Sequence, residues 1–188
     1  MKKDLGSVPA VCPMPVLIVS SYDVDGKINL MNAAWGMICQ LDKIALFIDE
    51  DHKTTQNILS KKAFTVGLAD KNSMVPADYV GIVSGNKVSD KFARSGLHAI
   101  KSKHVDAPII HEFPITMECE LAEVVKTANM YAIVGKIVNV CAEECVIGDD
   151  GKIDISKAEI LMFDQFEWNY NVLGEKVGKA GRVGKELF

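Results

Sequence analysis

Short apolar segments separated by tight turns run through most of this sequence. The Asp-Gly pair within residues 23–27 (DVDGK) is a strong signal for a tight hairpin. The segments at 114–127 and 130–147 are long for strands, so bends or bulges are expected around Gly135 and Cys141. About seven strands with short links favour a closed or partly closed antiparallel barrel, because closure removes exposed sheet edges. The principal strand candidates are residues 16–22, 29–39, 43–49, 63–69, 114–127 and 130–147.

Two or three short helices are expected between these strands. Within residues 50–62 (EDHKTTQNILSKK), either Thr54 or Thr55 can act as the N-cap of a helix. Further along, Ser89 is the expected N-cap of a helix of one or two turns that ends at Gly96. The overall expectation is a mainly β fold with short flanking helices.

Composition limits the classes of partner. The 188 residues are 48% hydrophobic and 24% charged, with a net charge of −4, which indicates a globular chain with no general attraction to nucleic acid or anionic membranes. The length predicts a single domain over 1–188, with residues 164–188 as a C-terminal arm. No membrane span is expected, because the sequence lacks a long uninterrupted apolar run.

The cysteines indicate the compartment. Five cysteines are an odd number in a mid-sized chain, which favours free thiols and a cytoplasmic protein. Cys141 and Cys145 lack a second pair of ligands, so no metal site is expected. Cys39 is either a thiol close to a redox site or, more commonly for a free cysteine, a small buried apolar residue.

The stretch NLMNAAWGMIC (29–39) carries little of the β-branched bulk that strands favour. Its small residues would let a planar heterocycle approach the backbone, with Trp35 as a flat face and Asn32 as a donor and acceptor pair. The alternative is a strand at a barrel corner with a bulge at Gly36.

Two later segments could bind a phosphate. In DEDHKTTQN (49–57), Lys53 and the threonine hydroxyls lie where a helix begins, and helix N-termini attract anions. In SGNKVSDKF (84–92), Lys87 and Lys91 lie beside another expected helix start. The alternatives are an ordinary capped loop for the first segment and a charged surface turn for the second.

Taken in order, five segments resemble the flavin reductase-like family of FMN-binding split barrels, and within it the flavoredoxin branch. The resemblance implies a Greek-key antiparallel split barrel of about six strands, usually a homodimer with one FMN per protomer. It covers nearly the whole chain. The segments are PMPVLIVSSYDVDGKINLMNAAWG, ALFIDEDHKTTQNI, GIVSGNKVSDKF, PITMECEL and YNVLGEKVGKAG.

The resemblance also implies where FMN would bind. The ring would lie against the 32–37 segment, and the phosphate against the helix start and the DKF segment. The implied cofactor-binding residues are Asn32, Ala33, Ala34, Trp35, Gly36, Met37, His52, Lys53, Thr54, Thr55, Asn57 and Lys91.

Such a protein needs no catalytic residue for the central step, because the flavin carries the electrons while the protein positions it. The expected function is therefore an FMN-dependent oxidoreductase that takes electrons from NAD(P)H or a redox protein. A non-catalytic FMN electron carrier that serves a protein partner is the alternative. A third possibility is a split barrel whose flavin site has become a structural or ligand-binding pocket.

Overall fold

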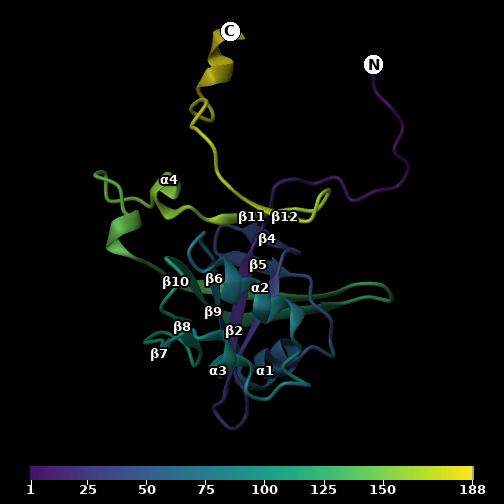
Figure 1. Cartoon of the computed structure of the whole chain (residues 1–188), viewed down its shortest axis with the longest axis vertical. Coiled ribbons are helices and arrows are strands. Elements are labelled where there is room, and N and C mark those ends of the chain that lie inside the picture. Colours follow the sequence, from purple (N-terminus) through teal and green to yellow (C-terminus); the bar gives the residue numbers. More distant parts are fainter. Residues whose placement is uncertain (188) are drawn as a thin grey trace.

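The computed structural model describes residues 1–187 and is built around a curled antiparallel sheet of seven strands (Figure 1). The order across the sheet is β3-β2-β6-β9-β10-β5-β4. The expected antiparallel split barrel is confirmed. These strands are β2 (Leu17–Tyr22), β3 (Ile28–Ala33), β4 (Gly36–Gln40), β5 (Lys43–Leu46), β6 (Ala63–Leu68), β9 (Ile115–Lys126) and β10 (Tyr131–Ala142).

Two smaller sheets and several short helices surround the barrel. One sheet has the order β1-β11-β12, and the other pairs β7 with β8. No helix within residues 1–187 is long and apolar enough to cross a membrane. The small-sheet strands are β1 (Met14–Pro15), β7 (Ala99–Lys101), β8 (Pro108–Ile110), β11 (Leu161–Asp164) and β12 (Asn169–Val172), and the helices are α1 (Lys53–Lys61), α2 (Met74–Ile82), α3 (Lys91–Ser95), α4 (Ile155–Ala158), η1 (Glu144–Val146) and η2 (Val183–Leu187).

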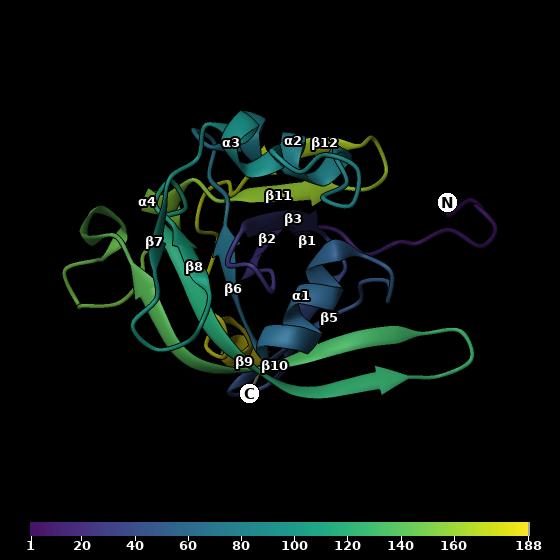
Figure 2. The same ribbon diagram turned by 90° about the horizontal axis from the view of Figure 1, so that it is seen from below.

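β2 is buried on both faces, which explains its continuous apolar run. Leu17 and Val19 face a core that includes Ile58 of α1, whereas Ile18 faces a second core that includes Val80 of α2. Figure 2 shows α1 on one side of β2 and β3 and α2 with α3 on the other. A strand covered on both faces loses the alternation of apolar and polar residues.

The stretch 29–39 forms two strands at opposite edges of the main sheet. β3 ends at Ala33 and β4 begins at Gly36, so Ala34 and Trp35 carry the chain from one edge to the other. A Cβ on Gly36 would lie 2.8 Å from Leu17 Cδ1, so this position needs a glycine to allow close packing. The small residues therefore build a corner of the barrel.

β9 and β10 form a long hairpin that bends. The pairing register shifts between Val134 and Gly135 and again between Ile137 and Asn139, so the bulge expected at Gly135 is confirmed and the one expected at Cys141 lies earlier. A Cβ on Gly135 would lie 2.3 Å from Phe64 Cζ. The bend thus lets the hairpin close over the core.

A buried carboxylate ties the β7–β8 hairpin to the barrel. Glu118 on β9 is 1% exposed. It accepts hydrogen bonds from the hydroxyl of Ser102, which follows β7, and from the side-chain amide of Asn139 on β10. Because burial of an ionisable side chain is costly without partners, this contact is a structural requirement of the fold.

The helix starts differ from the predicted ones. The N-cap of α1 is His52, so the prediction of Thr54 or Thr55 is wrong. The N-cap of α3 is Asp90 instead of Ser89, whereas the predicted end at Gly96 is confirmed by its left-handed conformation. The side chains of Thr54 and Thr55 are buried inside the first turn of the helix, so neither threonine occupies the cap position before it.

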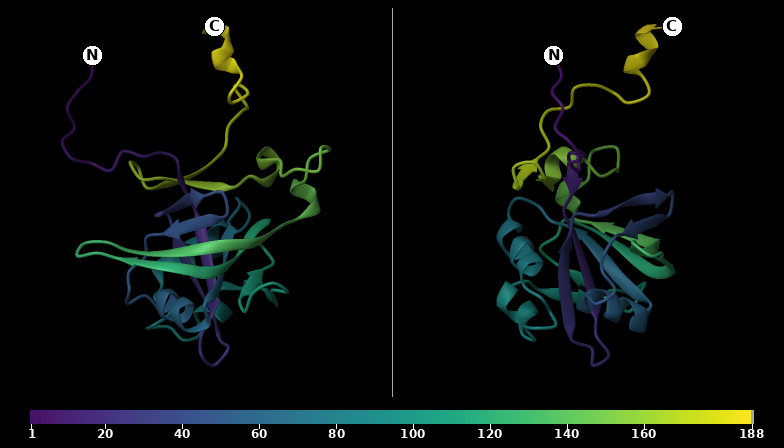
Figure 3. Two further views of the ribbon diagram at one scale, coloured as in Figure 1. Left: turned by 180° about the vertical axis from the view of Figure 1, so that it is seen from behind. Right: turned by 90° about the vertical axis from the view of Figure 1, so that its right-hand side faces the viewer.

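The two ends of the chain extend away from the barrel (Figure 3). Residues 169–172 of the expected C-terminal arm pair with β11. Residues 173–187 are exposed, including Val177 and Leu187. The arm therefore packs against the barrel mainly through its hairpin, and beyond the hairpin Lys176 Nζ donates to Asp154 Oδ1 at 2.9 Å.

Candidate functional site

Two cavities lie beside β3, one near each end of the strand. β3 is the last strand on one side of the main sheet, so its outward-facing backbone groups have no partner among the described strands. Helices α1, α2 and α3 all contact β3. Each cavity therefore joins a sheet edge to side chains from helices.

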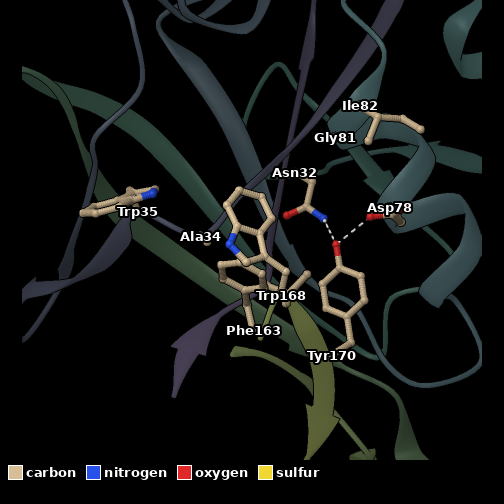
Figure 4. Close-up of a pocket in the computed structure, with 10 residues that line it drawn as sticks. Asn32, Ala34, Trp35, Asp78, Gly81, Ile82, Phe163, Trp168 and Tyr170 are labelled. Atoms are coloured by element: carbon tan, nitrogen blue, oxygen red, sulfur yellow. Dashed lines mark hydrogen bonds between the residues drawn. The ribbon is translucent and has the colours of Figure 1, made fainter. Parts of the chain in front are cut away.

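The Asn32 cavity lies at the C-terminal end of β3 and has a volume of 340 Å³ (Figure 4). Its walls come from the end of α2, the link between β3 and β4, and the β11–β12 hairpin. It is lined by Val16, Asn32, Ala34, Trp35, Asp78, Gly81, Ile82, Phe163, Trp168 and Tyr170.

Aromatic rings dominate this cavity. Phe163 and Trp168 pack edge to face with ring centroids 5.7 Å apart. Trp168 adopts a left-handed conformation with φ of 59° in the link between β11 and β12, and Trp35 remains 57% exposed. Such faces suit a planar ring, because aromatic groups pack favourably against one another.

A short hydrogen-bond network crosses the same cavity. Asn32 Nδ2 donates to the carbonyl oxygen of Ala77 at 3.1 Å and to the hydroxyl oxygen of Tyr170 at 3.4 Å. The Tyr170 hydroxyl donates to Asp78 Oδ1 at 2.8 Å. Burial, together with the bond to Asp78, raises the pKa of Tyr170 to about 12, so its hydroxyl stays protonated near neutral pH.

The Lys91 cavity lies at the N-terminal end of β3 and is smaller and more polar, with a volume of 130 Å³. Three of its lining side chains are lysines and one is an aspartate, so its charge is positive. It is lined by Asp23, Lys27, Ile28, Asn29, Lys53, Gly85, Val88, Ser89 and Lys91.

Two of these lysines are held in place. Lys91 is 5% exposed, and its Nζ donates to the carbonyl oxygen of Leu30 on β3 at 2.6 Å. Burial lowers the pKa of Lys91 to about 8. Lys53 Nζ lies 3.7 Å from Asp23 Oδ2. Lys91 thus places a buried ammonium group in this cavity, with no carboxylate within ion-pair distance of it among residues 1–187. The nearby Asp23 carboxylate is paired with Lys53 instead.

Two glycines let the segment after α2 approach β3. A Cβ on Gly85 would lie 2.1 Å from Asn29 Oδ1, and a Cβ on Gly81 would lie 3.0 Å from Asn32 Cβ. Real Cβ atoms are not found at the first distance. Gly85 is therefore required for the present shape of the Lys91 cavity.

The residues predicted at the start of α1 mostly face the interior. Thr54 Oγ1 accepts from Asn29 Nδ2 at 2.8 Å, and the Thr55 hydroxyl donates to the carbonyl oxygen of Asp49 at 2.6 Å. Asn57 Nδ2 donates to Ser21 Oγ at 3.2 Å. The polar groups of these side chains are already hydrogen-bonded within the protein. This helix start therefore offers a ligand chiefly the N–H groups of its first turn.

His52 and the acidic residues before it form a small surface group. Potential metal-ligating atoms of Asp49, Asp51 and His52 lie within 4.8 Å of one another. His52 Nε2 is 3.8 Å from Asp49 Oδ2. Exposed acidic groups commonly lie together without a metal ion, so this group is not assigned as a metal site.

The remaining predicted residues lie outside both cavities. Gly36 and Met37 line a separate apolar cavity of 450 Å³ that also borders Ala34 and Trp35. Ala33 is buried in the core below β3. Cys39 is exposed on β4, so its interpretation as a buried apolar residue is wrong.

The predicted residues are thus divided between locations. Asn32, Ala34 and Trp35 share the Asn32 cavity, and Lys53 and Lys91 share the Lys91 cavity. The sequence alone did not indicate several residues that complete these cavities from distant segments. They are Asn29, Asp78, Gly81, Gly85, Phe163, Trp168 and Tyr170.

Comparison with known proteins agrees with this architecture. Residues 10–163 match the model of the flavin reductase like domain. The flavoredoxin of Desulfovibrio vulgaris (Miyazaki F) is 35% identical, with a TM-score of 0.92 over 98% of this chain and 100% of that one. The flavoredoxin from Methanosarcina acetivorans is 27% identical, with a TM-score of 0.89 over 100% of both chains. An FMN-binding protein from Thermus thermophilus has the same fold at 20% identity, with a TM-score of 0.77 over 95% of this chain and 98% of that one.

Proposed function

The chain belongs to the flavin reductase-like family, in its flavoredoxin branch, and from this premise we propose that it is an FMN-binding oxidoreductase. It would take electrons from NAD(P)H or a redox protein and pass them to an acceptor. The observation that carries the proposal is the pair of cavities beside β3, one aromatic and one rich in lysine.

The Lys91 cavity fits the phosphate of FMN. A phosphate monoester carries nearly two negative charges at neutral pH, and Lys27, Lys53 and Lys91 line this cavity. The first turn of α1, which begins at Lys53, adds unpaired backbone N–H groups. The proposed phosphate-binding residues are His52, Lys53, Thr54, Thr55 and Lys91, the threonines acting through their backbone. Asn57 is not included, because its side chain donates to Ser21 and it lies beyond the first turn of α1.

The Asn32 cavity fits the isoalloxazine ring. Its aromatic walls and few polar groups suit a flat heterocycle with a polar edge. Asn29 and Asn32 are three residues apart on β3, which corresponds to roughly 10 Å along a strand. A ribityl chain with its phosphoester link can cover a separation of that order, so one FMN can reach both cavities.

In this proposal the cofactor and the protein have separate roles. Bound FMN supplies one- and two-electron transfer. The residues of this chain bind the two ends of the cofactor, fix the plane of the ring and exclude water from one of its faces. Trp35 and Trp168, both at the cavity surface, leave a side open to solvent from which a donor could approach.

Reconstitution tests the proposal. Purified apoprotein mixed with FMN should retain the cofactor after gel filtration, and should oxidise NADH or NADPH with ferric iron or free flavin as acceptor. If the protein elutes without FMN after mixing with a large molar excess of the cofactor, the proposal is wrong.

A carrier function is the second candidate, because two flavoredoxins match the fold over nearly their entire lengths. The binding residues would be the same. A carrier would hold FMN yet oxidise neither nicotinamide at a useful rate, and would accept electrons from a reduced iron–sulfur protein instead. Anaerobic mixing with each donor separates the two.

We also propose a cytoplasmic homodimer in which residues 1–188 form one FMN-binding domain and residues 164–188 its arm. The dimer is supported by exposed apolar side chains beside the site, including Trp35, Met37 and Phe47. The free cysteines support a reducing compartment. Light scattering that gives the mass of one chain would contradict the dimer.

A further inference from the structure

The side-chain amide of Asn32 is held in one orientation. Its Nδ2 lies 3.1 Å from the carbonyl oxygen of Ala77. A carbonyl oxygen can only accept hydrogen bonds, so the nitrogen of the amide must face it. The reversed orientation would place two acceptors against each other.

Tyr170 and Asp78 fix the second amide proton. The Asp78 carboxylate accepts, so the single hydroxyl proton of Tyr170 is donated to it over 2.8 Å. The Tyr170 oxygen is then left as an acceptor for Asn32 Nδ2 at 3.4 Å. Both amide protons of Asn32 are therefore used within the protein.

The oxygen of the same amide remains available. Figure 4 shows the Asn32 nitrogen facing Tyr170 and the oxygen turned away from it, on the side of Trp168. Within residues 1–187, the hydrogen bonds of this side chain all involve Nδ2. The cavity therefore presents an acceptor to a ligand between aromatic walls.

We propose that Tyr170 and Asp78 are positioning residues that keep Asn32 Oδ1 directed into the cavity, where it accepts a hydrogen bond from a ring N–H of the bound flavin. This inference rests on the proposed function, because it assigns the ring of FMN to the Asn32 cavity. The oxidised isoalloxazine carries one ring N–H, at the imide N3, and we assign that group as the donor.

The assignment explains why the β11–β12 hairpin contributes to the site. Tyr170 is 138 residues from Asn32 in the sequence, and its ring adds to the wall of the cavity. One side chain thus covers the cavity and sets the direction of the acceptor. Asp78 ensures that the hydroxyl donates away from the amide, so it cannot donate to Oδ1.

The test compares Tyr170→Phe with wild type in two measurements. The Kd for FMN, from quenching of flavin fluorescence, should rise by about two- to tenfold, which is the net value of one hydrogen bond. The proton resonance of the imide N–H of bound FMN should be downfield and slow to exchange in wild type and should move toward the value of free FMN in the variant. Tyr131→Phe is the matched control, because Tyr131 lies on β10 and lines neither cavity; both measurements should be unchanged.

A second variant separates positioning from a general structural role. In an Asn32→Ala background, Tyr170→Phe should have little further effect on the Kd, because the group that it orients is absent. An effect of equal size in both backgrounds would overturn the proposal. If Tyr170→Phe does not fold, Asp78→Asn replaces it. The new amide can donate to the Tyr170 oxygen, which frees the hydroxyl proton of Tyr170 to point toward Asn32.

The outcomes distinguish this inference from the function on which it rests. Wild type that does not bind FMN would overturn both. Wild type that binds FMN with an imide proton like that of free FMN would overturn the inference alone and leave the FMN function in place.

Discussion

FMN binding should weaken as the pH rises through about 8, because Lys91 loses its proton there. With a pKa of about 8, Lys91 is roughly nine-tenths protonated at pH 7 and roughly one-tenth at pH 9. The phosphate itself titrates near pH 6, so it stays a dianion throughout this range. If only the ammonium form binds phosphate, the apparent Kd is the intrinsic Kd divided by the protonated fraction, and it should rise about tenfold between pH 7 and pH 9.

Titrations of the apoprotein at both pH values measure this change. Riboflavin has no phosphate, so its Kd should be nearly the same at both. Lys91→Gln should bind FMN more weakly at pH 7 and lose most of the pH dependence, whereas Lys87→Gln should keep it, because Lys87 is exposed and lines neither cavity. An equal dependence for riboflavin, or its persistence in Lys91→Gln, would refute the reasoning.

Two further predictions concern the shape of the site and the stability of the fold. Gly85→Ala places a Cβ 2.1 Å from Asn29 Oδ1, so it should weaken FMN binding and lower the unfolding free energy by about 1–3 kcal/mol. Gly174→Ala is the control, because a Cβ there has no atom within 4 Å, and it should change neither quantity. Equal behaviour of the two variants in FMN titration and urea unfolding would contradict the close approach. Glu118→Ala leaves the Ser102 hydroxyl without its buried acceptor and should lower the unfolding free energy by about 1–3 kcal/mol for each orphaned partner; an unchanged urea midpoint would show that this carboxylate is not a structural requirement.

Local chemistry made much of the fold predictable. The Asp-Gly turn, the apolar run of β2 and the glycine that ends α3 are each determined by neighbouring residues. The division of 29–39 into two strands was not predictable, because it depends on which sheet edges the two halves join.

The site was predictable only in part, for the same reason. Lys53 and Lys91 were identified from expected helix starts, and they do share a cavity. Thr54 faces inward because Asn29, 25 residues earlier, bonds its hydroxyl. Tyr170 carried no local signal, since its role depends on contacts with α2 and β3 that only the folded chain creates.

A crystal structure of the protein with FMN tests the central claim most directly. The account predicts the isoalloxazine in the Asn32 cavity between Trp168 and the Ala34–Trp35 link, and the phosphate within hydrogen-bond distance of Lys53 or Lys91. A phosphate at any other position, or a ring on the apolar side of Trp35 next to Met37, would contradict it.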